Sequence, residues 1–247
     1  MIHQHTICQI GTFHSNHCED YVICEPIGQD RLLMAALDGC TMGDESYFAS
    51  TLFGRLLRKI AKECYYQEYV LDQQKSLATQ LKTVLQQLFA ELAIAKNLLQ
   101  LERNELLTTV LLAIVDNVEA KAEVICIGDG VVYCDGVLTE FDQENQPDYL
   151  TYHLGTDFET WYANAEQRLS LSAFSNLALC TDGLLTFASA EDTRTIIGEI
   201  EEVIACLLED DSDLGNERYF QKRLRRIQQD WGLVHTDDLG IVQLRIN

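Results

Sequence analysis

Three apolar, β-type runs in this chain end with the same dipeptide, Asp-Gly. They are "LLMAALDG" at 32–39, "VICIGDG" at 124–130 and "LALCTDG" at 177–183. Short apolar runs that stop at aspartate and glycine are typical of buried strands, and glycine lets the backbone turn sharply where a strand ends. The sequence therefore predicts a fold rich in β-sheet, with Asp38, Asp129 and Asp182 at the ends of strands.

The other patterned segments are further strands and a few helices. We expect strands at 5–13, 20–27, 31–39, 106–117, 121–130, 131–136, 137–142, 176–183 and 237–246, with a strand meander over 106–142. Helical spacing of apolar residues predicts one helix from an N-cap at Asp44 to about Glu63 and a second helix over 73–101. Two charged amphipathic helices are expected around 191–209 and 216–230.

This order of elements indicates the fold class. Strands come in hairpin-linked groups and helices in long pairs, which favours an α+β layered domain with antiparallel sheets over a parallel doubly wound one. With 247 residues, 47% of them hydrophobic, the chain can bury a sizeable core. It has only two prolines and no Ser/Gly-rich stretch, so we expect a single domain over 1–247.

Charge and cysteine usage limit the partners and the compartment. The formal net charge of −21 would repel nucleic acid and anionic membranes, so neither is expected as a partner. No apolar run approaches the ~20 residues that span a bilayer. Several of the nine cysteines, such as Cys126, Cys180 and Cys206, lie inside apolar runs, and no secretory signal is visible. We therefore expect a protein of the reducing cytoplasm.

Acidic residues also stand at the start of two other strands. Glu19 and Asp20 open the strand at 20–27, and Asp237 and Asp238 open the last strand. If these strand ends face one another, carboxylates 4 Å apart would repel by about 4 kcal/mol at an effective dielectric near 20. Such a group needs cations, and oxygen ligands suit Mg²⁺ or Mn²⁺. The alternative interpretation is that each aspartate is a turn residue on a solvated acidic surface.

The order of these motifs resembles a known family, the metal-dependent protein phosphatases of type 2C. The resemblance is carried by "CED" (18–20), "LDGCTMG" (37–43), "LLTTVLLAIV" (106–115), "IGDGVVY" (127–133), "CTDGLL" (180–185) and "TDDLGIVQL" (236–244). It covers nearly the whole chain. It implies a four-layer αββα sandwich, in which two central antiparallel β-sheets are flanked by helix pairs. It also implies a phosphoprotein substrate, because members of this family hydrolyse phosphoserine and phosphothreonine through a water that bridges two divalent metals.

The resemblance assigns metal-binding roles to seven positions: Glu19, Asp20, Asp38, Gly39, Asp129, Asp182 and Asp237. By this analogy Asp38 bridges two Mg²⁺ or Mn²⁺ ions and Gly39 lends a carbonyl oxygen. Asp182 and Asp237 are terminal ligands and share the catalytic role with Asp38. Glu19 and Asp20 hold metal-bound waters, and Asp129 binds a third, weaker metal.

The chain departs from the family at several positions. Ser15, with His14 and His17 nearby, stands where the family has a phosphate-binding arginine. Cys40 stands where some members have a histidine. Thr186 and Asp238 replace an aspartate and an asparagine, which weighs against the third metal. The missing arginine leaves open an alternative, a catalytically weak or inactive phosphatase-fold module that regulates or binds other proteins.

Overall fold

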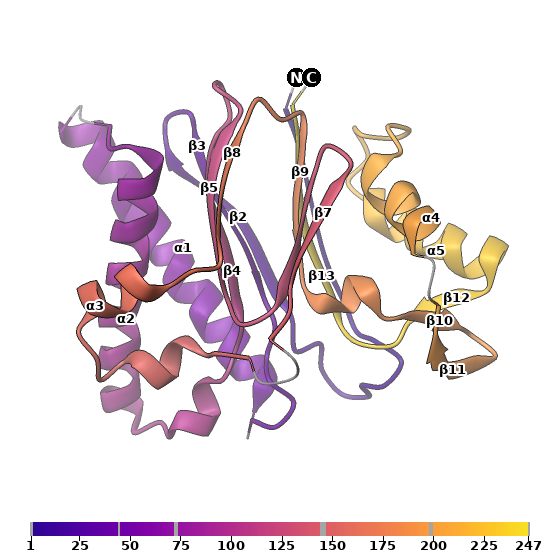
Figure 1. Ribbon diagram of the computed structural model, residues 1–247, viewed down its shortest axis with the longest axis horizontal. Coiled ribbons are helices and arrows are strands. Elements are labelled where there is room, and N and C mark those ends of the chain that lie inside the picture. Colours follow the sequence, from indigo (N-terminus) through magenta and orange to yellow (C-terminus); the bar gives the residue numbers. More distant parts are fainter. Residues whose placement is uncertain (1, 44, 72–73, 144–146, 198–199, 247) are drawn as a thin grey trace.

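The computed structural model describes residues 2–43, 45–71, 74–143, 147–197 and 200–246. The expected N-cap at Asp44 lies outside these ranges. Two five-stranded sheets occupy the centre of the molecule (Figure 1). Sheet one has the order β2 (Tyr21–Gly28), β3 (Arg31–Leu37), β4 (Val110–Asp116), β5 (Lys121–Ile127) and β8 (Arg168–Ser172). Sheet two has the order β1 (Ile2–Gln9), β13 (Leu239–Ile246), β9 (Asn176–Cys180), β6 (Gly130–Cys134) and β7 (Val137–Phe141).

Helices cover the outer faces of the two sheets. Sheet one carries α1 (Ser46–Leu71) and α2 (Leu77–Leu99), and sheet two carries α4 (Glu201–Ile204), the π-helical turn η4 (Ala205–Glu209) and α5 (Tyr219–Trp231) (Figure 1). Smaller elements are η1 (Arg103–Leu106), η2 (Leu150–His153), α3 (Phe158–Asn164), η3 (Asp182–Leu185) and a small sheet of β11 (Asp192–Ile196), β10 (Phe187–Ser189) and β12 (Leu233–His235). The strand pairings of the described residues are all antiparallel, so the predicted α+β class with antiparallel sheets is confirmed.

Strand β3 shows why its sequence is a continuous apolar run. Leu33, Ala35 and Leu37 pack under α1 and α2, whereas Leu32 and Met34 face sheet two. Successive side chains of a strand point to opposite faces, and both faces of this strand are buried. A strand covered on both sides needs apolar residues at every position, which the run "LLMAAL" provides.

The structure corrects several predicted boundaries. Helix α1 ends at Leu71 instead of about Glu63. The helix predicted over 191–209 is wrong in its first part, because the β-branched run in 192–196 forms strand β11 against β10. The short elements η2, α3, β8, β10 and β12 were not predicted, since each has too few residues to establish a period.

The predicted meander over 106–142 is also wrong, because the chain changes sheets within it. Strand β5 belongs to sheet one and β6 to sheet two. Gly128, with φ +94°, and Asp129 lie between them, and Gly130, with φ +154°, is the first residue of β6. These backbone angles favour glycine. The Gly-Asp-Gly turn therefore places Asp129 where the chain passes from sheet one to sheet two.

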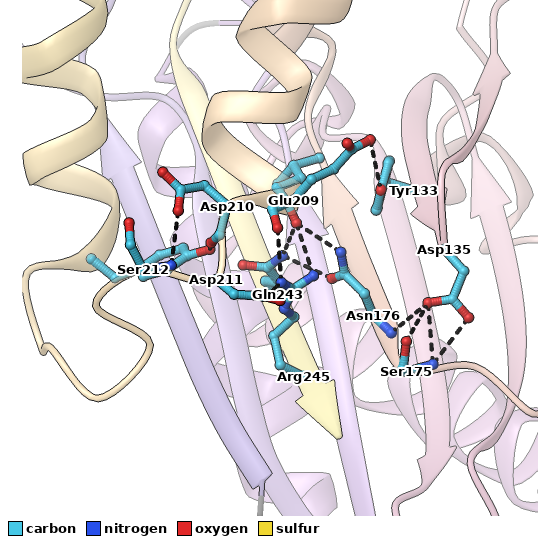
Figure 2. Close-up of polar contacts among 12 residues, drawn as sticks. Tyr133, Asp135, Ser175, Asn176, Glu209, Asp210, Asp211, Ser212, Gln243 and Arg245 are labelled. Carbon is cyan, nitrogen blue, oxygen red and sulfur yellow. Dashed lines mark hydrogen bonds and ion pairs between the residues drawn. The ribbon is translucent and has the colours of Figure 1, made fainter. Parts of the chain in front are cut away.

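A buried polar network ties the helical side of sheet two to its strands (Figure 2). The carbonyl oxygen of Leu208 accepts hydrogen bonds from Asn176 Nδ2 at 2.7 Å, Gln243 Nε2 at 2.9 Å and an Arg245 guanidinium nitrogen at 3.2 Å. Gln243 Nε2 also donates to Asn176 Oδ1 at 2.8 Å, and Tyr133 donates to Glu209. The three donors to Leu208 satisfy a carbonyl group near the end of the η4 turn, where helix carbonyls lack intrahelical partners.

We expect the Gln243→Ala substitution to lower the free energy of unfolding by about 2 kcal/mol, because it leaves buried acceptors short of a donor. Gln243 is 0% exposed. Urea unfolding followed by circular dichroism measures the change. The matched control is Gln229→Ala on the exposed face of α5, which should change stability by less than about 0.5 kcal/mol. Equal effects of the two substitutions would contradict this role of the network.

Candidate metal-binding acidic site

The predicted strand ends meet at one place, at the end of the sheets opposite the two chain termini. Strand β1 leads from the N-terminal end to this place and β13 leads back, with Gln9 opposite Leu239 and Ile2 opposite Ile246 (Figure 1). Asp237 precedes β13, Asp20 precedes β2 and Asp38 follows β3. Asp182 begins η3 directly after β9. Four segments far apart in the sequence thus contribute carboxylates to the same region.

Asp38 lies at the centre of this group. Its carbonyl oxygen accepts hydrogen bonds from Thr109 N at 2.8 Å and Thr108 Oγ1 at 2.7 Å, which fix the chain where it leaves β3. Burial raises the pKa of Asp38 well above its ordinary value, and repulsion by three carboxylates raises it further: Asp20, Asp182 and Asp237. Repulsion of this kind requires that the four side chains be near one another. The structure therefore brings these four predicted residues together.

Asp20 is a buried member of this acidic group, and only one of its two carboxylate oxygens has a hydrogen-bond partner in the described part of the chain. It is 5% exposed. Its Oδ2 accepts a hydrogen bond from Thr181 Oγ1 at 2.8 Å, whereas its Oδ1 is buried and has no hydrogen-bond partner among the described residues. Burial raises its pKa, against the effect of the Thr181 hydrogen bond, and the negative charges of Asp238 and Asp182 act in the same direction as burial. A buried carboxylate oxygen without a partner is costly unless a cation or water satisfies it.

Asp182 and Asp129 extend the group toward the Gly-Asp-Gly turn. Burial raises the pKa of Asp182 to about 6, with added repulsion from Asp237 and Asp129. Burial also raises the pKa of Asp129, as does the charge of Asp142. Asp129 Oδ1 is a second buried carboxylate oxygen without a hydrogen-bond partner in the described part of the chain. Asp129 therefore joins the group through Asp182.

A backbone hydrogen bond joins Gly39 to Glu19, and each of them also contacts other residues nearby. Gly39 N donates to the carbonyl oxygen of Glu19 at 3.2 Å, and a Cβ on Gly39 would lie 2.3 Å from the carbonyl oxygen of Ser46. Only glycine allows this close approach between the β3 end and the start of α1. Glu19 Oε2 accepts a hydrogen bond from Thr41 Oγ1 at 3.0 Å. The predicted metal-binding roles of both residues stay predictions.

Asp238 has a role that sequence reasoning missed. It is 2% exposed, and its Oδ1 accepts the N–H of Gly11 at 2.7 Å while its Oδ2 accepts the N–H of Glu19 at 2.5 Å. His14 Nδ1 lies 2.9 Å from Oδ2. An aspartate offers two acceptor oxygens, whereas an asparagine would present an NH₂ group to one of these donors. Asp238 thus closes the loop 11–19, and the replacement of asparagine by aspartate is the signal that could have revealed it.

The positions that differ from the family have local contacts of their own. Burial alone would lower the pKa of His14, but its contact with Asp238 and the charges of Asp238 and Glu19 raise it above the ordinary value. Ser15 is exposed, and the His17 ring lies 4.4 Å from that of Tyr47. Thr186 Oγ1 accepts the N–H of Asp237 at 3.1 Å, so Thr186 positions the residue before the last strand.

The donor set suits a hard divalent cation. Within the described ranges, no three His, Cys, Asp or Glu side chains are close enough to enclose a metal ion as they stand. The gathered groups are carboxylates, two of their buried oxygens have no hydrogen-bond partner in those ranges, and their mutual repulsion would fall if a cation bound between them. The residues present therefore fit Mg²⁺ or Mn²⁺ chemically, and the ligand assignments stay predictions.

In the presence of a chelator, the Asp38→Asn substitution should raise the free energy of unfolding by about 1–2 kcal/mol at neutral pH, because it removes one of several repelling charges. The folded-state pKa of Asp38 is raised, so its carboxylate destabilises the fold increasingly as pH rises above about 4. The gain in stability should therefore vanish toward acidic pH. Chemical unfolding in EDTA across pH measures this.

The control for this experiment is Asp192→Asn, since Asp192 is exposed on β11. It should change stability by less than about 0.5 kcal/mol at any of these pH values. If Asp38→Asn is neutral or destabilising in EDTA, the carboxylates do not repel as described.

Comparison with known proteins agrees with this fold. The family profile described as Protein phosphatase 2C matches residues 11–226. Comparison with curated protein sequences finds no match. No described helix is both long and apolar enough to cross a lipid bilayer.

Solved structures with the same fold have low sequence identity to the chain. One contains the phosphatase domain and a fragment of the regulatory domain of the cell fate determinant SpoIIE from Bacillus subtilis, at TM-score 0.60 and 13% identity; the match covers 100% of this chain and 64% of that one. An arginine-to-alanine variant of a bacterial serine phosphatase matches with a TM-score of 0.63 and 16% sequence identity. That match covers 100% of this chain and 99% of the other. The S. agalactiae serine/threonine phosphatase matches with a TM-score of 0.62 and 14% sequence identity, over 100% of both chains.

Proposed function

The chain belongs to the protein phosphatase 2C family, and we propose that it hydrolyses phosphoserine and phosphothreonine in proteins with Mg²⁺ or Mn²⁺ as cofactor. The observation that carries the proposal is the mutual repulsion of Asp38 with Asp20, Asp182 and Asp237, which follow or precede strands of both sheets. Such repulsion lowers stability and is typical of sites whose charges serve a function. We also propose a single domain over 1–247 and a cytoplasmic protein, the latter supported by its many core cysteines.

In this proposal each residue of the acidic site has a defined role. Asp38, Asp182 and Asp237 hold the cations, with Gly39 lending its carbonyl oxygen. Asp20 is oriented by Thr181, and Asp237 by Thr186. The bound cations supply Lewis acidity, which lowers the pKa of a water molecule and neutralises charge on the phosphoryl oxygens. Asp129, carried on the turn between the sheets, is the candidate for the third and weaker cation.

Purified protein should hydrolyse p-nitrophenyl phosphate and a phosphothreonine peptide with added Mn²⁺ or Mg²⁺ and not in EDTA. The Asp182→Asn substitution should lower kcat/KM by at least about 100-fold, because it removes a ligand. Asp230→Asn, an exposed position on α5, is the matched control and should retain wild-type activity. Absence of metal-dependent turnover with both substrates would rule out the proposed activity.

A second candidate function is a phosphatase-fold module with weak or no catalysis. The observation that favours it is the exposed Ser15 at the arginine position, next to a His14 that is already engaged with Asp238. A neutral or engaged imidazole replaces a bidentate guanidinium poorly. This candidate predicts binding of metal or partner protein without appreciable turnover.

The Ser15→Arg substitution distinguishes these two candidates. A charged hydrogen-bond donor at this position should raise kcat/KM about tenfold, because a charge-assisted contact with the substrate phosphate is worth about 1.5 kcal/mol. Ser15→Gln, which has similar reach and no charge, should leave kcat/KM unchanged. High wild-type turnover with no gain from arginine would instead show that the site functions without this residue.

A further inference from the structure

Two cysteines meet beside the acidic pair. Cys8 is the next-to-last residue of β1, opposite Gly240 of β13, and Cys18 directly precedes Glu19. An interaction with the Cys8 side chain, together with burial, raises the pKa of the Cys18 thiol, so the two side chains are neighbours. The Cys18 sulfur also lies 3.9 Å from the carbonyl oxygen of Asp20, to which it donates. Cys8 is exposed and Cys18 is partly buried.

The backbone already holds these two cysteines together. One oxygen of Asp238 accepts the N–H of Gly11, three residues after Cys8, at 2.7 Å, and the other accepts the N–H of Glu19, next to Cys18, at 2.5 Å. The ends of the loop are therefore close before any covalent bond forms. A disulfide can join two cysteines only if the backbone places their side chains face to face, and a loop closed in advance adds little entropic cost.

We propose that Cys8 and Cys18 form a reversible disulfide, which makes this thiol pair an oxidation site at the base of the loop 11–17. The oxidant is hydrogen peroxide. The exposed Cys8 sulfur attacks a peroxide oxygen, the O–O bond breaks, and water leaves with the Cys8 proton, giving a sulfenic acid. The Cys18 sulfur then attacks the Cys8 sulfur and the S–O bond breaks. The hydroxide that leaves takes the Cys18 proton as a second water, so the peroxide gains the two electrons that the sulfurs lose.

The bond would act on the acidic pair next to it. Oxidation removes the Cys18 proton that is donated to the Asp20 carbonyl oxygen. It also shortens the distance between the sulfurs to about 2.05 Å, which draws Cys18 toward β1 and shifts Glu19 and Asp20. We therefore expect oxidation to lower Mn²⁺-dependent phosphatase activity by about tenfold or more, as loss of supporting contacts does at other metal sites. This consequence rests on the proposed function, whereas formation of the disulfide does not.

The test uses the purified full chain, treated with hydrogen peroxide and then mapped by peptide mass spectrometry without reduction. The expected result is a linked pair of peptides containing Cys8 and Cys18, which dithiothreitol separates. Cys8→Ser should abolish the linked pair and protect the activity from peroxide. Cys134→Ser is the matched control, because Cys134 is partly exposed on β6, and it should behave as wild type.

Other patterns would overturn the proposal. Linkage of Cys8 to Cys24, or no intramolecular link in a protein that peroxide has modified, would show that the contact between Cys8 and Cys18 is not a disulfide site. If Cys8→Ser fails to fold, Cys8→Ala and mapping of the wild-type chain give the same decision. If the reduced protein shows no metal-dependent phosphatase activity, the proposed function is rejected. The disulfide proposal is not affected, since peptide mapping does not depend on turnover.

Discussion

Repulsion among buried carboxylates is the constraint on which the arrangement of this molecule depends. Asp20 and Asp182 both raise the pKa of the buried Asp38, and Asp182 also raises that of Asp20. Burial in a medium of low dielectric strengthens such repulsion. The rest of the fold must supply enough favourable packing to hold these charges in place, and two sheets with buried faces do so.

The packing that opposes this repulsion comes from central strands that bury apolar side chains on both faces. Side chains of β3 and β4 alternate between the helices of sheet one and the face of sheet two, so both faces of each strand bury apolar surface. Asp38 directly follows β3, and Asp182 lies just after β9, whose faces are also buried, so the core sets the backbone positions of both carboxylates. A rigid support of this kind is what a site of precisely spaced ligands requires.

The sequence predicted the parts of this design that depend on local pattern. Long apolar runs and an Asp-Gly end marked β3, β5 and β9, and helical spacing marked α1 and α2. The change of sheet at Gly128 and Gly130 was not predicted, because a hairpin meander and a crossover have the same local sequence. The grouping of Asp38 with Asp237 came from the order of motifs in a family, since strand register across two sheets is a long-range property.

The roles of Asp238 and Thr186 were missed for a different reason. Both positions looked like losses of family residues, but in the structure each provides backbone contacts that support its neighbours. A residue that binds backbone N–H groups leaves no periodic or spacing signal in the sequence.

Asp238 also explains how the site and the loop 11–19 can depend on each other. The carboxylate of Asp238 accepts hydrogen bonds from both ends of this loop, and the following residues enter β13, which pairs with β1. A shift of the loop would therefore reach Glu19 through its own N–H, and Asp237 through the adjacent peptide. This buried contact acts together with those that Gly39 N makes to Glu19 and Thr181 Oγ1 makes to Asp20, so contacts within the protein fix the acidic pair relative to the other strand ends.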